Sequence, residues 1–159
     1  MSYTKTIFHI VLRPYRNENV IDESHERELY GYILGFCRNK NVKLIRVGGM
    51  PDHVHLLVAL PATMALSKFV QELKVSTSKW LKENLHFPRF KRWSKEYAGF
   101  SCSYWDRTII ANYIKRQKEH HRNVTFEDEH REFLAQNGIV IEERYFFADE
   151  NVPSLRDGA

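Results

Sequence analysis

One ten-residue stretch, Pro51–Leu60, constrains the fold of this chain more than any other. It places two histidines two residues apart and continues as an apolar run without charge. Bounded by Pro-Asp before it and Pro61 after it, this run predicts a strand that is buried on both faces. Alternation along a strand puts His53 and His55 on the same side, roughly 6.5–7 Å apart at Cα.

Two imidazoles at that spacing can converge on one divalent cation. They can equally be two core histidines that hydrogen-bond to the backbone, because a buried polar ring requires a partner. A His-x-His pair by itself is weak support for a metal site. A metal site needs a third ligand from another part of the chain.

Length and composition favour one globular domain over residues 1–150, with residues 151–159 as a disordered tail. The chain has 159 residues, of which 43% are hydrophobic and 13% aromatic. No apolar run approaches the roughly 18 residues of a membrane span, and no signal-peptide pattern opens the chain, so we expect a cytoplasmic protein without a membrane partner. Cys37 and Cys102 lie far apart and outside any CxxC motif, which indicates reduced thiols.

The charge is unevenly distributed along the chain. The net charge is +4, but residues 127–150 contain eight acidic and two basic residues, and residues 151–159 cancel, so residues 1–126 carry +10. A basic body suggests a polyanionic partner, although many basic proteins bind nothing in particular.

The order of elements predicts an α+β fold of the ferredoxin-like βαββαβ type, in which helices cover one face of an antiparallel sheet. The expected strands cover residues 3–13, 42–50, 53–60 and 100–104. The expected helices cover residues 22–38, 63–84, 107–122 and 125–138. Asp22, Thr63 and Thr125 are the expected helix caps. The pair Gly48-Gly49 suggests a turn or bulge at the end of the second strand.

A basic and aromatic segment lies between the second helix and the last strand. From residue 79 to residue 95, six basic residues accompany a single acidic one, with three aromatic rings interleaved. Cations that follow phosphates and rings that stack on bases are what single-stranded nucleic acid requires. The alternative is a solvated loop whose rings pack on the core. The candidate DNA-binding residues here are Lys79, Lys82, Arg89, Lys91, Arg92, Trp93 and Lys95.

The expected helix at residues 107–122 carries the third group. Tyr113 and Gln117 are four apart and would share one helical face. A tyrosine hydroxyl is a nucleophile when ionised, and a glutamine carbonyl is an acceptable ligand for Mg²⁺ or Mn²⁺. If this helix lies over the histidine strand, His53, His55 and Gln117 would hold the metal. His120 and His121 are further candidate ligands, or a pair that binds phosphate or stabilises the end of the helix.

These residues together resemble the single-tyrosine HUH transposases of small bacterial insertion sequences, the IS200-like transposase family. The resemblance covers about residues 3–145 and rests on His53-Val54-His55 within the βαββαβ order, on Tyr113 with Gln117, and on His120-His121. It implies a metal-dependent enzyme in which Tyr113 attacks a scissile phosphate in single-stranded DNA and leaves a 5′-phosphotyrosine and a free 3′-hydroxyl.

The resemblance also implies hairpin DNA at element ends as the partner, and a homodimer whose subunits can share active sites. Two other functions are alternatives to this one. A histidine-triad nucleotide hydrolase would need a third alternating histidine, but Leu57 occupies that place. A catalytically silent, domesticated hairpin-binding regulator stays open, although the site residues are all present.

Overall fold

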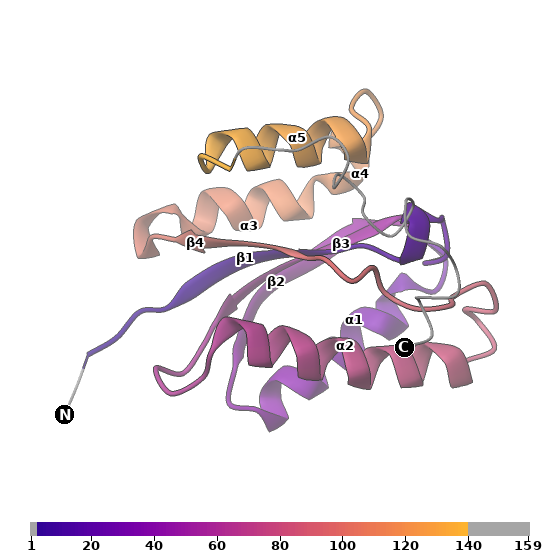
Figure 1. The fold of residues 1–159 in the computed structure, drawn as a ribbon, viewed down its shortest axis with the longest axis horizontal. Coiled ribbons are helices and arrows are strands. Elements are labelled where there is room, and N and C mark those ends of the chain that lie inside the picture. Colours follow the sequence, from indigo (N-terminus) through magenta and orange to yellow (C-terminus); the bar gives the residue numbers. More distant parts are fainter. Residues whose placement is uncertain (1–2, 140–159) are drawn as a thin grey trace.

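The structure is a computed structural model that describes residues 3–139 of the chain. Its four strands form one antiparallel sheet, with two helices on one face and three on the other (Figure 1). The strands are β1 (Ile7–Leu12), β2 (Lys43–Met50), β3 (His53–Ala59) and β4 (Ala98–Cys102). The helices are α1 (Glu26–Asn39), α2 (Leu66–Glu83), α3 (Arg107–Lys115), α4 (Gln117–His120) and α5 (Phe126–Gln136), with short 3₁₀ turns η1 (Tyr15–Asn17) and η2 (Tyr104–Asp106).

The sheet has the strand order β2-β3-β1-β4, which is the order of a ferredoxin-like βαββαβ fold. β3 pairs with both β1 and β2, so it lies inside the sheet, whereas β2 and β4 form the edges. The predicted fold class is therefore confirmed. The histidine strand occupies an interior position of the sheet.

Both faces of β3 are covered, as the uncharged run after His55 predicts. Residues 53–58 are all buried. Val54, Leu56 and Val58 belong to the main core beneath α1 and α2. His53, His55 and Leu57 face the other way, where Leu57 packs in a small cluster with Ile114 of α3. The helices that follow β4 therefore cover the face that carries the histidines.

Two predicted helix caps are wrong, and one is confirmed. α1 begins at Glu26 because Asp22 instead accepts hydrogen bonds from the backbone and hydroxyl of Ser24, in a turn before the helix. α2 begins at Leu66, and no side chain caps it. Thr125 does cap α5, and its Oγ1 accepts from the backbone of Asp128 at 3.2 Å.

Gly48-Gly49 is neither a turn nor a bulge. Both glycines lie within β2, and the hairpin turns at Pro51 and Asp52 instead. The shift in register of this hairpin falls near Leu44, at the opposite end of β2. The absence of a side chain at Gly48 serves helix packing, because a Cβ there would lie 2.9 Å from the carbonyl oxygen of Ile114.

The single helix predicted over residues 107–122 is divided in two. α3 ends at Lys115, Arg116 leaves the helical conformation (φ −95°, ψ 18°), and α4 starts at Gln117. Lys118 holds α4 in place, because its Nζ donates to the carbonyl oxygen of Gly49 at 2.5 Å and to Glu26 at 2.7 Å. Tyr113 and Gln117 therefore lie on consecutive short helices.

Two other predictions can be compared with the described residues, and a third cannot. Cys37 and Cys102 are free thiols, and burial raises the pKa of Cys37 to about 12. Within residues 3–139, no helix is long and apolar enough to cross a membrane. The predicted tail at residues 151–159 and the end of the predicted domain at residue 150 lie outside the described residues.

Candidate functional site

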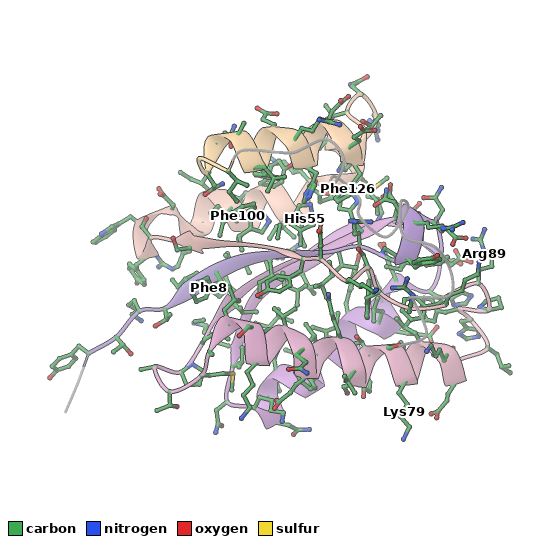
Figure 2. The ribbon with its side chains drawn as sticks, viewed as in Figure 1. Phe8, His55, Lys79, Arg89, Phe100 and Phe126 are labelled. Carbon is green, nitrogen blue, oxygen red and sulfur yellow. The ribbon has the colours of Figure 1, made fainter. Side chains whose placement is uncertain are left out.

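The Nε2 atoms of the two histidines of β3 contact Gln117 of α4 and Glu129 of α5. His55 accordingly lies between the sheet and the C-terminal helices (Figure 2). Both side chains are fully buried, and their ring centroids are 5.0 Å apart. Each ring is oriented through its other nitrogen. Nδ1 of His53 lies 2.7 Å from Asp52 Oδ1, and Nδ1 of His55 lies 2.7 Å from Nε2 of His9. Metal-binding histidines typically have such a partner on the second nitrogen.

His9 is part of the site, although the sequence analysis did not identify it. It lies on β1, directly beside β3, and is 3% exposed. Burial, followed by the proximity of His55, lowers the pKa of His9 to about 3, and burial lowers the pKa of His55 to about 4. Both rings are therefore neutral near pH 7. The two-residue period of β1 could have pointed to His9, because residues 7, 9 and 11 share one face of the strand and His9 is the polar one between Ile7 and Val11.

α3 and α4 bring the predicted nucleophile and amide to these histidines within one chain. Gln117 is buried, and its Oε1 lies 2.7 Å from Nε2 of His53. Tyr113 is half-buried, with its ring centroid 5.9 Å from that of His55. The structure thus brings together His53, His55, Tyr113 and Gln117, the four residues that the sequence singled out for chemistry.

The centre of the cluster is Glu129, which the sequence analysis missed. This carboxylate lies on α5 and is 2% exposed. Its Oε1 lies 2.8 Å from Nε2 of His55, and its Oε2 accepts hydrogen bonds from the hydroxyl of Tyr113 and, at 3.1 Å, from Nε2 of Gln117. The signal was its position three residues after Phe126 and four before Phe133, on the apolar stripe of the helix.

His120 and His121 turn inward to the same carboxylate. The Nε2 atom of each lies 3.1 Å from Oε2 of Glu129. Burial disfavours the charged form of His121, but the hydrogen bond and charge of Glu129 outweigh it and raise the pKa of that ring. His120 remains partly exposed, whereas the side chain of His121 is 5% exposed.

The buried carboxyl group of Glu129 is held in its ionised form by the imidazoles around it. Burial opposes ionisation of Glu129, yet its hydrogen bonds to His121 and His55 keep the pKa of this carboxyl well below its usual range. Burial and then the hydrogen bond to Glu129 raise the pKa of Tyr113. Without a cation, the phenol of Tyr113 is therefore held protonated.

The donor atoms of the cluster fit a divalent cation. One ligand atom from each of His53, His55 and Glu129 lies within 4.8 Å of the others, and Gln117 adds a carbonyl oxygen beside His53. Imidazole nitrogen together with hard oxygen donors suits first-row divalent metals such as Mn²⁺.

The predicted DNA-binding residues of the 79–95 segment do not gather at this site. Lys79 points outward from α2, on the opposite side of the sheet from His55 (Figure 2). The guanidinium of Arg92 stacks on the ring of Tyr15 at 3.9 Å, and Lys91 lies 3.5 Å from Glu18. The remaining basic residues of the group are exposed, namely Lys82, Arg89 and Lys95.

The prediction that Trp93 stacks on DNA bases is wrong. Trp93 is 5% exposed, and its Nε1 donates to Thr77 Oγ1 at 2.9 Å. Phe87 and Phe90 are buried in the same core. The rings of this segment therefore pack against α2, as the alternative interpretation held, because they are needed to close the hydrophobic core at that end of the molecule.

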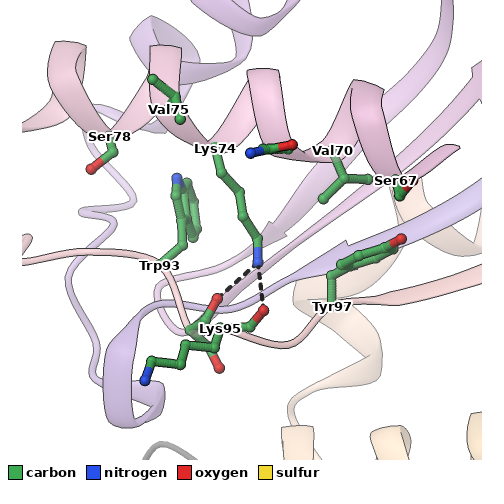
Figure 3. Close-up of a pocket in the computed structure, with 10 residues that line it drawn as sticks. Ser67, Val70, Lys74, Val75, Ser78, Trp93, Lys95 and Tyr97 are labelled. Carbon is green, nitrogen blue, oxygen red and sulfur yellow. Dashed lines mark hydrogen bonds between the residues drawn. The ribbon is translucent and has the colours of Figure 1, made fainter. Parts of the chain in front are cut away.

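A cavity of about 440 Å³ lies elsewhere, between α2 and the segment before β4 (Figure 3). Lys74 crosses it, and its Nζ donates to the carbonyl oxygens of Ser94 at 2.8 Å and Lys95 at 3.2 Å. These bonds tie the segment to α2. None of the histidines lines this cavity, so it is separate from the cluster around Glu129.

Two solved structures share the fold. A putative transposase from Deinococcus radiodurans R1 superimposes with a TM-score of 0.56 at 22% identity, over 73% of this chain and 93% of the other. A REP-associated tyrosine transposase bound to a REP hairpin superimposes with a TM-score of 0.57 at 18% identity, over 78% of this chain and 73% of the other. These likenesses establish the fold.

Sequence comparison assigns the family. The transposases for insertion sequence element IS200 from Salmonella typhimurium and Salmonella typhi are each 32% identical over 120 residues, which cover 70% of this chain and 76% of theirs. Residues 2–117 match the family described as "Transposase IS200 like". The chain therefore belongs to the IS200-like transposase family.

Proposed function

We propose that this transposase cleaves and rejoins single-stranded DNA through a covalent tyrosine intermediate, with Tyr113 as the nucleophile. The observation that carries the proposal is the convergence of Tyr113, Gln117 and the two histidines of β3 in one buried cluster. Among the tyrosines within residues 3–139, Tyr113 is the one whose hydroxyl bonds to a carboxylate that also contacts His55.

The proposed reaction is a transesterification. Oη of Tyr113 loses its proton to solvent and forms a bond to the scissile phosphorus. The bond from phosphorus to the 3′ oxygen breaks, and that oxygen takes up a proton and becomes a 3′-hydroxyl. The 5′-phosphate stays on Tyr113, and attack by another 3′-hydroxyl reverses the sequence and joins the strands.

We propose that His53, His55 and Gln117 hold Mg²⁺ or Mn²⁺. The Nε2 atoms of both buried rings lie within 3.5 Å of Oε1 of Glu129, and the amide oxygen of Gln117 lies 2.7 Å from Nε2 of His53. Each ring is also oriented by a second partner, which supports this assignment. A bound cation would polarise the scissile phosphate and offset the charge that develops in the transition state. The imidazoles fix that position because the rings of His53 and His55 cannot turn away from Asp52 and His9 without losing a hydrogen bond.

The proposed DNA surface includes residues on the α3 side of the sheet. Trp105 is 83% exposed, and the ring of Tyr104 lies 3.5 Å from the guanidinium of Arg107 and 5.1 Å from Nζ of Lys5. Exposed rings among cations suit stacking on unpaired bases, and stacking contributes about 1–3 kcal/mol per base. We expect Trp105→Ala to weaken binding of a single-stranded oligonucleotide by about fivefold or more, in a fluorescence-anisotropy titration.

A homodimer is also proposed. β4 is short and forms one edge of the described sheet, and an edge strand can pair with a second chain. Because one chain brings Tyr113 to its own histidines, the site that we propose is complete within each subunit. A monomeric mass in solution at micromolar concentration, with cleavage retained, would contradict the dimer.

The test of the proposed function is covalent capture of DNA. Wild-type protein is incubated with labelled single-stranded DNA from the ends of the element and Mn²⁺, and adducts are resolved by denaturing electrophoresis. We expect an adduct with wild-type protein and none with Tyr113→Phe, while hairpin binding is retained. An adduct that persists in Tyr113→Phe identifies another nucleophile. Binding without any adduct in wild type favours a silent hairpin-binding regulator.

A further inference from the structure

Glu129 occupies a position where a carboxylate is costly unless it has a strong partner. It lies on the apolar face of α5, beyond residue 117 at which the family match ends. Its side chain is 3% exposed and lies against the rings of His55, His120 and His121. An isolated buried carboxylate would cost several kcal/mol, so such groups are paired or bind a metal.

The distances around Glu129 match those between neighbouring ligands of one metal ion. Its Oε1 lies 2.8 Å from Nε2 of His55 and 3.5 Å from Nε2 of His53. An octahedral ion with bonds of about 2.1 Å keeps adjacent ligand atoms about 3.0 Å apart. The carboxylate oxygen therefore stands beside the two imidazoles at the spacing of a third ligand.

The two oxygens of Glu129 face different groups. Oε1 faces the imidazoles of β3, whereas Oε2 contacts the hydroxyl of Tyr113, Nε2 of Gln117, and the rings of His120 and His121. A ligating carboxylate is usually hydrogen-bonded on its other oxygen. Oε2 has these partners already, so Oε1 can bind a cation while Oε2 still holds Tyr113 beside it.

We propose that Glu129 is a metal ligand, which completes with His53 and His55 a donor set for a divalent cation of the Mn²⁺ class. The inference rests on the proposed function only in taking this cluster as the metal site of the reaction. It also gives α5 a role, because the helix that lies beyond the family match then supplies part of the site. The rival interpretation is that Glu129 occupies the place of the cation and must withdraw before a metal binds.

The two interpretations predict opposite effects on Mn²⁺ affinity when the negative charge of Glu129 is removed. The full-length protein without DNA is titrated with Mn²⁺, and the free ion is followed by electron paramagnetic resonance. For a ligand, Glu129→Gln should weaken Mn²⁺ binding by about tenfold or more. The matched control is Asp128→Asn, an exposed neighbour on the same helix, which should bind like wild type. Binding by Glu129→Gln that equals or exceeds that of wild type would overturn the proposal.

A second variant keeps the test decisive if Glu129→Gln does not fold, which thermal unfolding would reveal. Glu129→Asp keeps the charge but withdraws the oxygens by about 1.5 Å, so it should also weaken Mn²⁺ binding, and wild-type affinity would again overturn the proposal. The result of this Mn²⁺ titration can be told apart from the result of the adduct assay that tests the proposed function. If Glu129→Gln loses Mn²⁺ binding but wild-type protein forms no DNA adduct, the proposed function is refuted and the assignment of Glu129 as a metal ligand stands. A DNA adduct in wild type, together with wild-type Mn²⁺ binding in Glu129→Gln, refutes Glu129 as a metal ligand and leaves the proposed function standing.

Discussion

Replacing Gly48 by alanine tests how the fold builds the site. Gly48 pairs with His55 across the hairpin, and α3 passes so close that an added Cβ would lie 2.9 Å from the carbonyl oxygen of Ile114 and 3.1 Å from its Cγ2. A separation under 3.0 Å is essentially never seen for a real Cβ. Because the carbonyl oxygen belongs to the backbone, α3 itself must move, and it carries Tyr113 with it.

The size of the effect follows from these distances. Ordinary contact begins at 3.4 Å, so α3 must retreat by roughly 0.5 Å, the difference between 3.4 and 2.9 Å. Overpacking of this kind costs about 1–3 kcal/mol of unfolding free energy, or about 2–12 °C in Tm for a chain of this size. A nucleophile displaced by about 1 Å can lose about 10²-fold in rate, so we expect adduct formation to slow by about tenfold.

The matched controls are Gly31→Ala and Gly35→Ala in α1, where an added Cβ meets nothing within 4 Å. The same chemical change should there raise stability by about 0.5–1 kcal/mol, because alanine is the better helix former. Circular dichroism melts give Tm, and the adduct assay gives the rate. If Gly48→Ala melts and reacts like wild type, α3 does not rest on β2 as described, and the explanation of how Tyr113 is positioned fails.

Three further predictions concern the site itself. His53→Ala should abolish adduct formation but leave hairpin affinity nearly unchanged, because affinity comes mainly from basic surface residues; cleavage at the wild-type rate with Mg²⁺ present would refute the metal assignment. Gln117→Ala should slow cleavage less severely, since water can fill a vacated position on Mg²⁺; complete loss in a time course would show that its amide has a further role. Mixing His53→Ala with Tyr113→Phe subunits should restore no activity, because one chain supplies both groups; recovery in verified heterodimers would indicate a site shared between subunits.

Much of the fold could be predicted because its signals are local. The uncharged run after His55 predicted a strand buried on both faces, and β3 is buried in that way. The spacing of apolar residues identified α2 and α5, even where a cap was wrong. Asp22 failed as a cap because a short polar side chain can bond within a preceding turn as easily as at a helix end. Thr63 failed because α2 begins only at Leu66, after Ala65.

The aromatic residues of the 79–95 segment show where composition stops being informative. A ring among cations has the same sequence pattern whether it stacks on a base or closes a core. Trp93 is buried because its indole lies against α2, a contact between residues far apart in the chain. The exposed ring of Trp105 lacks the run of basic neighbours that drew attention to the other segment.

The sequence by itself determined the chemistry of the candidate site, since His53, His55, Tyr113 and Gln117 are recognisable by residue type and spacing. Tertiary structure alone decided that His9 and Glu129 join them. Side chains that alternate along one strand or recur on one helix can be assigned to a shared face from periodicity. Which faces of β1 and α5 meet β3 depends on packing between distant elements, here the burial of Phe126 of α5 in one cluster with Val11 of β1, and that contact has no local signature.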